Sequence, residues 1–483
     1  MSTALRESIV QLDEYRWMLP QTGGMRVPGI LFASRPLLEK MLSDKTPEQV
    51  MNAAHLPGIL EASIAMPDAH WGYGLPVGGV VATDPREGVV SPGAVGYDIG
   101  CGVRLLRSTL TRGELTPHRE ALADALYHEV PCGVGSHGAQ RVSFTDLARV
   151  LREGAGWVVR SGHGSPSDLE HCEEGGVLAD ADPGAVSEDA KRRGKDQLGT
   201  LGSGNHFLEV QEVTEVYDQE AARALGLATG VVTVMIHCGS RGLGHQVCTD
   251  HVRDVVRKLS GWGIALPDRQ LACAPLPTPE AQSYLGAMRA AANYAWANRQ
   301  FIADEVRRAF ESVLHRSAEA LGLQLVYDVA HNIAKFESHQ TSGGQIRCLV
   351  HRKGATRSFP AGHPDVPAAY RAVGQPVLVP GDMGRYSFVL IGGEGAMRHA
   401  FGSTCHGAGR QMSRTQAVRE TRGRDLVAEL RAAGVTVRYE GRDTLGEETS
   451  EAYKDVAEVV RVCEGAGLAR PVAKLVPFIV VKG

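Results

Sequence analysis

The chain has 483 residues, of which 43% are hydrophobic and 22% are charged, and its net charge is −4. This composition is typical of a globular protein with ample apolar material for a core, and the charge argues against a general grip on duplex nucleic acid while leaving room for a local basic pocket. The nine cysteines are scattered and form no C-x-x-C pair, which predicts a protein without disulfides. There is no signal peptide, and no apolar run approaches the roughly 20 residues that span a bilayer, so we expect a soluble cytoplasmic protein without a membrane anchor.

Short strands and turns are predicted over residues 25–110, where apolar runs alternate with Gly and Pro. Residues 115–130 favour a helix, and the polar segment 140–200 favours surface helices and loops. A helix and a Pro-containing link are expected over 245–272. A longer helix follows over 278–316, where Thr278, Pro279 and Glu280 supply an N-cap, a first-turn proline and an acidic first turn. The segment 245–316 should therefore be mainly helical.

Strand-like runs return after this helix, in LQLVYDVAH, GQIRCLVHRK, QPVLVPG and YSFVLIGG, and the tail PVAKLVPFIVVKG is typical of a final strand. No change of composition indicates a flexible linker. Chemically distinctive residues are spread from position 98 to position 406 and can meet only if the intervening chain folds as one unit. We therefore expect one large α+β domain over 1–483, with β-sheets flanked by helices.

Candidate metal ligands lie at the ends of apolar runs in glycine-rich surroundings. They are Asp98, Cys101, His206, His237 and His331. A lone D-x-x-C is weak, since most buried cysteines act as small hydrophobes, and one strand-end histidine is more often a hydrogen-bonded core residue. Three such histidines beside D-x-x-C favour a metal centre. Imidazole, thiolate and carboxylate suit manganese, zinc, cobalt or iron better than magnesium, and a cysteine sulfur can bridge two ions.

Polar neighbours of these residues have two interpretations each. Asp68 in MPDAHWGYGLP could form a Pro-Asp turn or orient a catalytic histidine. Asn205 and Glu209, on either side of His206, could support the metal site or contact a ligand, or could be a turn cap and a surface carboxylate.

His406 in GSTCHGAGR differs from the other histidines, because small residues on both sides leave its ring approachable, as a covalent nucleophile requires. If a helix begins near His406, Arg410 shares its face, and the helix N-terminus and the guanidinium together form a phosphate seat. Cys405 is the rival nucleophile. Lys353, Arg241 and Arg414 could bind phosphates of an RNA end or could be solvated charge.

Two motifs are missing from the sequence. There is no G-x-x-x-x-G-K-[ST], which excludes a P-loop, and there is no K-x-D-G, the lysine motif of familiar nucleotidyltransferase ligases. Any nucleotide transfer would need another nucleophile, and histidine is the natural candidate.

These blocks carry a resemblance to a known family. The chain closely resembles the RtcB-type RNA-splicing ligases nearly from end to end. The blocks that carry this resemblance are RVPGILFA, MPDAHWGYGLPVGG, SPGAVGYDIGCGVRL, QLGTLGSGNHFLEVQ, HCGSRGLGHQV, ANRQ, YDVAHN, VHRKGATR, GSTCHGAGR, AYKD and VVKG. The resemblance implies a single RtcB-like domain. It also implies an enzyme that joins 2′,3′-cyclic-phosphate or 3′-phosphate RNA ends to 5′-hydroxyl ends, in tRNA splicing or RNA repair, with GTP as co-substrate and two manganese ions.

The resemblance also implies a role for each matching residue. The five candidate ligands would bind the two manganese ions, with Cys101 as the bridge, and Asp68 would orient His406, which would carry a covalent GMP. The expected guanine-nucleotide contacts are Asn205, Glu209, Asp382, Ser387, Arg410, Tyr453 and Lys482. RNA ends, GTP and an archease-type activating protein are the expected partners of a monomer or homodimer.

One position departs from the family pattern, since many members have a serine where this chain has Asp382. Its carboxylate would contact guanine N–H groups or alter nucleotide preference. Two other functions remain open: a metal-dependent hydrolase of phosphate esters or cyclic phosphates that does not use His406, and an RNA-end-binding protein with structural metals. A structural site is usually closed and four-coordinate, whereas the expected pair needs open positions.

Overall fold

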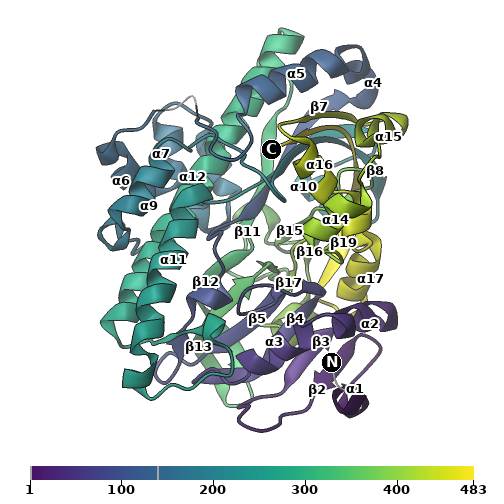
Figure 1. Cartoon of the computed structure of the whole chain (residues 1–483). Coiled ribbons are helices and arrows are strands. Elements are labelled where there is room, and N and C mark those ends of the chain that lie inside the picture. Colours follow the sequence, from purple (N-terminus) through teal and green to yellow (C-terminus); the bar gives the residue numbers. More distant parts are fainter. Residues whose placement is uncertain (1–2, 139–140) are drawn as a thin grey trace.

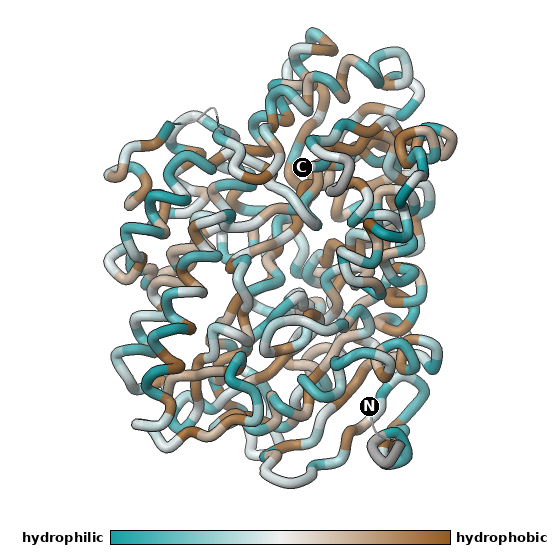
Figure 2. Tube along the Cα trace, in the orientation of Figure 1, coloured by the Kyte–Doolittle hydropathy of each residue, from teal (hydrophilic) through white to brown (hydrophobic). Residues whose placement is uncertain are grey.

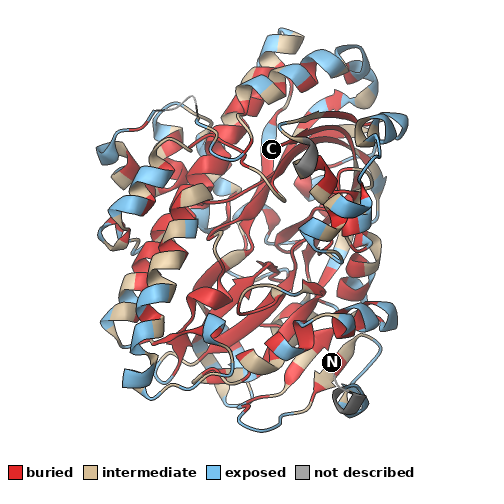
Figure 3. Cartoon of the chain, in the orientation of Figure 1, coloured by how far each residue is buried: buried red, intermediate tan, exposed pale blue. Residues whose placement is uncertain are grey.

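Two large β-sheets form the centre of the protein, and most of the helices lie outside them (Figure 1). The computed structural model describes residues 3–138 and 141–483. Most strands of the sheets are buried, whereas the outer faces of the surrounding helices are exposed (Figure 3). Hydrophobic segments accordingly follow the central strands in Figure 2. The expected α+β class, with β-sheets flanked by helices, is confirmed.

The first sheet has seven strands in the order β1-β2-β3-β4-β5-β13-β12. Its strands are β1 (Val10–Gln11), β2 (Arg16–Leu19), β3 (Gly29–Phe32), β4 (Ile59–His70), β5 (Val77–Thr83), β12 (Asn332–Thr341) and β13 (Gly344–Lys353). Only the β3–β4 pair in this order is parallel. The sheet thus joins the N-terminal strands to a hairpin that follows the long helix in sequence.

The second sheet has the order β11-β7-β9-β8-β19-β16-β15, and β18 also pairs with β19. Its strands are β7 (Gly102–Thr111), β8 (Phe207–Val216), β9 (Val231–Cys238), β11 (Gln324–Ala330), β15 (Pro376–Val379), β16 (Ser387–Gly392), β18 (Thr436–Tyr439) and β19 (Ala469–Lys482). The tail is therefore a central strand. Two small ribbons pair β6 (Val89–Val90) with β10 (Ala274–Pro275), and β14 (Ala355–Arg357) with β17 (Ser403–Cys405).

The helices include one long central element, α12 (Pro279–Leu314), which begins at the expected cap: the Thr278 side chain accepts from the N–H of Ala281. Its middle is buried almost all round, so it is a core helix rather than a surface one. The other helices are α1 (Thr3–Ser8), α2 (Arg35–Ser43), α3 (Thr46–Ala53), α4 (Arg112–Leu115), α5 (Arg119–Glu129), α6 (Phe144–Glu153), α7 (Ala155–Arg160), α8 (Pro166–Glu170), α9 (Glu188–Lys195), α10 (Gln219–Leu225), α11 (Arg241–Lys258), α13 (Glu394–His399), α14 (Arg414–Glu420), α15 (Leu426–Ala432), α16 (Arg442–Glu447) and α17 (Val456–Gly465).

Several predicted elements match these bounds. Helix α5 lies within 115–130, and short helices and loops occupy 141–200. Helix α11 begins at Arg241 and ends at Lys258, and single turns and Pro267 follow it, which matches the expected helix and Pro-containing link except that the helix begins four residues earlier. Among the described residues, no helix combines the length and apolar character required to cross a membrane.

Candidate metal centre and active-site pocket

Five neighbouring strands of the second sheet each have one terminus on the same side of that sheet. Because adjacent strands run antiparallel, the starts of β7, β8 and the ends of β11, β9, β19 meet there: Gly102 pairs with Ala330 and Cys238, and Phe207 pairs with His237 and Lys482. Cys101, His206, His237 and His331 lie at or next to these ends. The sheet therefore brings together histidine and cysteine side chains that are far apart in sequence.

The candidate ligands form two overlapping groups of donor atoms. One comprises Cys101, His237 and His331, and the other Asp98, Cys101 and His206; within each group the atoms lie within 4.8 Å of one another. Cys101 Sγ is 3.3 Å from His237 Nε2 and 3.5 Å from His206 Nε2. His206 Nε2 is 2.8 Å from Asp98 Oδ2, and His237 Nε2 is 3.3 Å from His331 Nε2. Since Cys101 belongs to both groups, the donor set fits two cations that share its sulfur.

The surroundings of these atoms also fit cations. The carbonyl of Leu201 is 2.9 Å from His206 Nδ1, which leaves Nε2 for the site. Burial and the neighbouring histidines lower the pKa of His237 and of His331, so both rings are neutral, as ligands must be. Burial raises the pKa of the Cys101 thiol to about 12, helped by the charge of Asp98. Metal binding would therefore release the thiol proton.

Asp98 is held by the backbone after His237. The N–H of Ser240 donates to Asp98 Oδ1 over 3.0 Å, and a Cβ on Gly239 would lie 2.3 Å from that oxygen, so only glycine fits there. Burial works to raise the pKa of Asp98, but hydrogen bonding to His206 and the charge of that ring outweigh it and lower the pKa to about 2. The carboxylate is thus ionised and fixed.

His406 faces this centre from the other side. It follows β17, and its ring centroid is 4.8 Å from that of His331. Its Nδ1 is 2.6 Å from Oδ2 of Asp68 on β4, and the same oxygen accepts from the backbone N–H of His406 over 3.0 Å. Asp68 is fully buried. The carboxylate therefore fixes the ring and leaves its Nε2 free of this contact.

The pocket between these groups has a volume of about 270 Å³. It is lined by thirteen of the predicted residues: Asp98, Cys101, Asn205, Glu209, His237, His331, Lys353, Asp382, His406, Arg410, Arg414, Tyr453 and Lys482. Four others lie outside its wall. His206 and Asp68 bond to wall residues, Ser387 is buried with its Oγ accepting from Gly381, and Arg241 donates to Thr200.

The condition of a helix that begins at His406 is not met. The chain from His406 to Ser413 is irregular, and the next helix, α14, begins only at Arg414. Gly409 has φ +74°, and a Cβ on it would lie 2.0 Å from the carbonyl of Asp68, so close backbone approach replaces helical turns. Arg410 still reaches the pocket, but without a helix N-terminus beside it. Cys405, the rival nucleophile, is buried on β17.

Glu448 gathers three predicted nucleotide contacts and was missed by the sequence reasoning. It accepts from Arg410 Nη1 over 3.0 Å and from the Tyr453 hydroxyl, and Lys482 Nζ lies 3.4 Å from its Oε2. Burial opposes its charge, but Lys482 and Arg410 keep the pKa of Glu448 below its ordinary value. This buried anion just after α16 (Arg442–Glu447) has little sequence signal, because Arg410 and Lys482 come from distant segments and only Tyr453 is near it in the chain.

Other polar groups of the pocket have defined partners. Burial raises the pKa of Glu209 to about 8. Asp382 pairs with Arg385 over 2.5 Å, and its other oxygen accepts from Gly384 and Ser450. Lys353 donates to the carbonyls of Tyr73 and Leu75, and burial lowers its pKa to about 7. Its ammonium therefore supports the pocket wall in this structure.

Buried charges also lie behind the metal centre. Arg299, on α12, donates to the carbonyl of Gly100 over 2.7 Å and to that of Cys238 over 2.8 Å, and it pairs with Asp328. Those carbonyls adjoin Cys101 and His237. Asn298 donates to the carbonyl of Gly239 over 3.2 Å. These ANRQ residues tie the long helix to the loops that carry the ligands.

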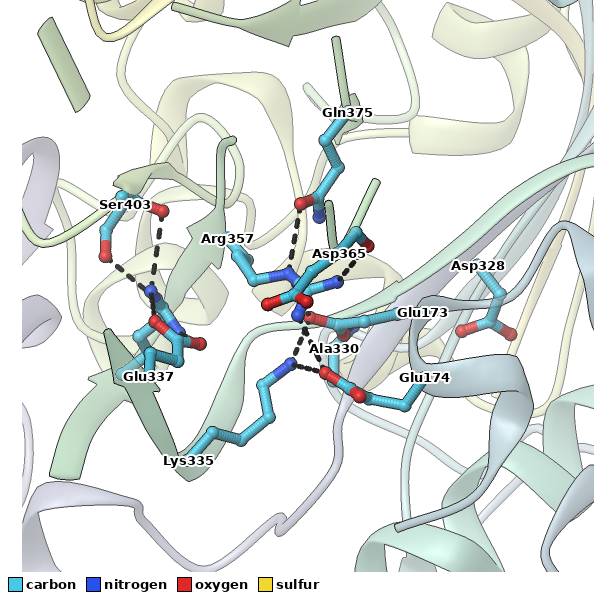
Figure 4. A network of polar contacts seen from close by, with 12 residues as sticks. Glu173, Glu174, Asp328, Ala330, Lys335, Glu337, Arg357, Asp365, Gln375 and Ser403 are labelled. Atoms are coloured by element: carbon cyan, nitrogen blue, oxygen red, sulfur yellow. Dashed lines mark hydrogen bonds and ion pairs between the residues drawn. The ribbon is translucent and has the colours of Figure 1, made fainter. Parts of the chain in front are cut away.

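A second buried network reaches His331 from another direction. Lys335 and Arg357 point toward Glu173 and Glu174 (Figure 4), with Lys335 Nζ 2.6 Å from Glu173 and Arg357 Nη1 2.7 Å from Glu174. Glu173 also accepts from the N–H of Ala330, the residue before His331. The Lys335–Glu173 pair is deeply buried, whereas 34% of the Glu174 side chain is accessible, and a buried ion pair of this kind is weak evidence for stability.

Comparison with known proteins gives a consistent result. Residues 49–483 match the family model described as tRNA-splicing ligase RtcB. A tRNA-splicing ligase RtcB of Thermococcus kodakarensis is 54% identical over 474 residues, 98% of each chain. One of Archaeoglobus fulgidus is 53% identical over 475 residues, 98% of each chain. An RNA-splicing ligase RtcB of Mycobacterium bovis is 54% identical over 440 residues, covering 90% of this chain and all of its own.

Proposed function

Because the chain belongs to the RtcB family of RNA ligases, we propose that it joins 3′-phosphate or 2′,3′-cyclic-phosphate RNA ends to 5′-hydroxyl ends through a GMP bound covalently to His406. One arrangement carries the proposal: the ring of His406, oriented by Asp68, lies beside His331 in the same pocket as the two donor groups. A hydrolase would need the donor groups but not this oriented histidine.

In the first step His406 Nε2 attacks the α-phosphorus of GTP. The N–P bond forms as the bond from the α-phosphorus to the pyrophosphate oxygen breaks, and pyrophosphate leaves. The ring then carries a proton on Nδ1 and phosphorus on Nε2, so it is cationic. The carboxylate of Asp68, 2.6 Å from Nδ1, stabilises that charge and selects the tautomer whose Nε2 lone pair can attack.

In the next steps an oxygen of the RNA 3′-phosphate attacks the phosphorus of GMP, the P–N bond breaks, and His406 is regenerated. The 5′-hydroxyl oxygen then attacks the phosphorus of the activated 3′ end, GMP leaves, and the hydroxyl proton passes to solvent. A cyclic phosphate is first opened by water to give the 3′-phosphate. Covalent catalysis thus divides one difficult condensation into easier transfers.

Asp98, Cys101, His206, His237 and His331 would hold two manganese ions. When bound, these ions supply positive charge that offsets the charge developing on the triphosphate and leaving groups. Among the chain's own groups, Arg410, Tyr453 and Lys482 would contact the guanine nucleotide once it replaces their interactions with Glu448. Asn205, Glu209 and Asp382 line the same pocket and would also contact the nucleotide. Ser387 lies outside the wall, and its Oγ would hold the wall residue Gly381 in place by accepting from its N–H.

RNA phosphates would meet Arg414 and Lys353 at the pocket, with Arg241 beside Asp98. The pocket carries basic side chains, but the protein as a whole is not basic, since its net charge is −4. RNA recognition should therefore be local to the ends being joined rather than spread along a duplex.

The test is incubation with labelled GTP and manganese followed by mass spectrometry of the intact protein. We expect a GMP adduct that is labile to acid and absent from His406→Ala. Joining of 3′-phosphate RNA to 5′-hydroxyl RNA is then measured with the same protein. Folded, metal-loaded wild-type protein that forms no adduct but hydrolyses phosphate esters would overturn the ligase mechanism in favour of a hydrolase.

A further inference from the structure

Trp71 is the most exposed large aromatic side chain among the described residues, with 59% of its surface accessible. It follows the end of β4 directly, one residue after His70, which lines the pocket, and close in sequence to Asp68. An exposed tryptophan contributes little to the core, and this one is the chain neighbour of His70 in the pocket wall, so a ligand near the pocket entrance is a candidate for its contact.

The backbone around Trp71 is held rigidly even though its ring is not buried. Gln49, a buried residue on α3, donates to the carbonyls of Gly72 and Gly74 over 2.7 and 2.9 Å, and its Oε1 accepts from the N–H of Gly72 over 3.0 Å. Asp44 accepts from the N–H of Trp71 over 3.1 Å. A buried amide used in this way fixes the loop and presents the ring to solvent.

Positive charge lies beside the ring. Lys45 Nζ is 5.1 Å from the centroid of the Trp71 ring, and both side chains are exposed. Lys40 Nζ donates to Gln411 Oε1 over 2.7 Å, and Gln411 adjoins the pocket residue Arg410. The carboxylate of Asp44 is the opposing charge, and its two oxygens accept from the N–H groups of Thr46 and Trp71. Lys45 thus lies beside the ring, and Lys40 contacts the chain neighbour of the pocket residue Arg410.

We propose that Trp71 is a stacking platform for an unpaired base of the RNA beside the join, with Lys40 and Lys45 next to its phosphates. The inference rests on the proposed function, because it takes RNA ends as the substrate. Every base has a π face, so stacking of this kind holds an RNA end without selecting its sequence. A ligase that joins broken ends of varied sequence needs such a contact. The base belongs to the 3′-phosphate strand or to the 5′-hydroxyl strand, and the two are tested separately.

Binding is measured by fluorescence anisotropy with labelled single-stranded RNA and manganese-loaded protein without GTP, so that no joining occurs. One RNA ends in a 3′-phosphate and the other begins with a 5′-hydroxyl. Trp71→Ala should raise the Kd for one of them by about 5- to 100-fold, and Trp71→Phe should restore most of the affinity. Adduct formation by the wild type without RNA tests the proposed function separately, so either can fail alone.

Phe144 provides a matched control. It is also an exposed aromatic residue, 47% accessible, with Lys195 Nζ 5.2 Å from its ring centroid, but it lies on α6, and neither of its chain neighbours lines the pocket, whereas Trp71 follows the lining residue His70. Phe144→Ala should leave both Kd values within about twofold of the wild type. A nonspecific loss of exposed aromatic surface would instead weaken binding equally in both variants.

Abasic nucleotides identify the stacked base. RNA that lacks the stacked base should bind wild-type protein as weakly as intact RNA binds Trp71→Ala. The abasic RNA and the variant combined should raise the Kd no more than either change alone. Unchanged RNA affinity in Trp71→Ala, or additive losses at every abasic position, would overturn the platform. Unchanged affinity would instead point to a protein partner at this face.

Discussion

Oδ2 of Asp68 accepts both from the ring of His406, 2.6 Å from Nδ1, and from the backbone N–H of the same residue at 3.0 Å. The carboxylate thus fixes the position of the histidine and the orientation of its ring together. Lys454 supports this arrangement, because its buried ammonium donates to the carbonyls of Pro67 and Ala69 on both sides of Asp68.

Asp68→Asn tests whether the carboxylate selects the tautomer of His406. An amide N–H directed at Nδ1 would favour the proton on Nε2, the atom that must attack. We expect adduct formation to slow by about 10²- to 10⁴-fold while the protein stays folded. Labelled GTP incorporation and thermal unfolding measure the two effects. Normal adduct formation in this variant would rule out the orienting role.

Cys101→Ala tests the shared sulfur. Cys101 Sγ lies 3.3 Å from His237 Nε2 and 3.5 Å from His206 Nε2, so its loss should weaken both metal positions at once and abolish ligation. Metal content after dialysis and the thiolate absorption of the cobalt-loaded protein provide the measurements. Cys248→Ala is a control, because Cys248 is equally buried but belongs to neither donor group. A variant at Cys101 that ligates normally would exclude the bridge.

The raised pKa of Glu209 should make the free energy of unfolding depend on pH. Burial raises its pKa to about 8 from 4.5 in the unfolded chain, so between these values the folded state keeps a proton that the unfolded state loses. Stability from this group therefore falls as the pH rises from 5 to 8. Urea unfolding of the metal-free protein should show Glu209→Gln gaining stability relative to the wild type across that range.

Glu215 on the same strand is the control for this measurement. The hydrogen bond from Lys474 lowers the pKa of its exposed carboxyl, so the group is ionised in the folded protein throughout pH 5 to 8. The difference between Glu215→Gln and the wild type should stay constant over that range. Parallel pH profiles for Glu209→Gln and the wild type would contradict the buried, protonated state.

The residues that form the two donor groups could be picked out from the sequence, because strand-end histidines and D-x-x-C have a recognisable local context. It also located α12, whose Thr278 cap and alanine-rich run are local signals. It did not decide the backbone at Arg410, where Gly409 approaches Asp68 closely and no helix forms, and it did not point to Glu448, whose partners Arg410 and Lys482 come from distant segments. Such contacts depend on tertiary packing, which local propensity does not describe.

Arg299 belongs to the ANRQ block, whose sequence alone assigns it no role, and the folded chain reveals its partners. It joins the carbonyls of Gly100 and Cys238, next to two candidate metal ligands, to the carboxylate of Asp328. Arg299→Lys keeps the charge but cannot reproduce the planar fork that makes these contacts together. We expect about 10- to 100-fold weaker metal affinity, as is usual when the groups that orient ligands are changed.

Competition with a chelator measures that affinity, and the cobalt spectrum reports the ligand geometry independently of activity. Arg253→Ala is the control, because its pair with Asp250 is on the surface, with 56% of the Arg253 side chain accessible, and should contribute no more than about 1 kcal/mol to stability. If Arg299→Lys unfolds at lower urea but binds cobalt with wild-type affinity and spectrum, the residue stabilises the core without positioning the ligands. Weaker affinity with an altered spectrum would instead show that α12 sets the metal geometry from behind the sheet.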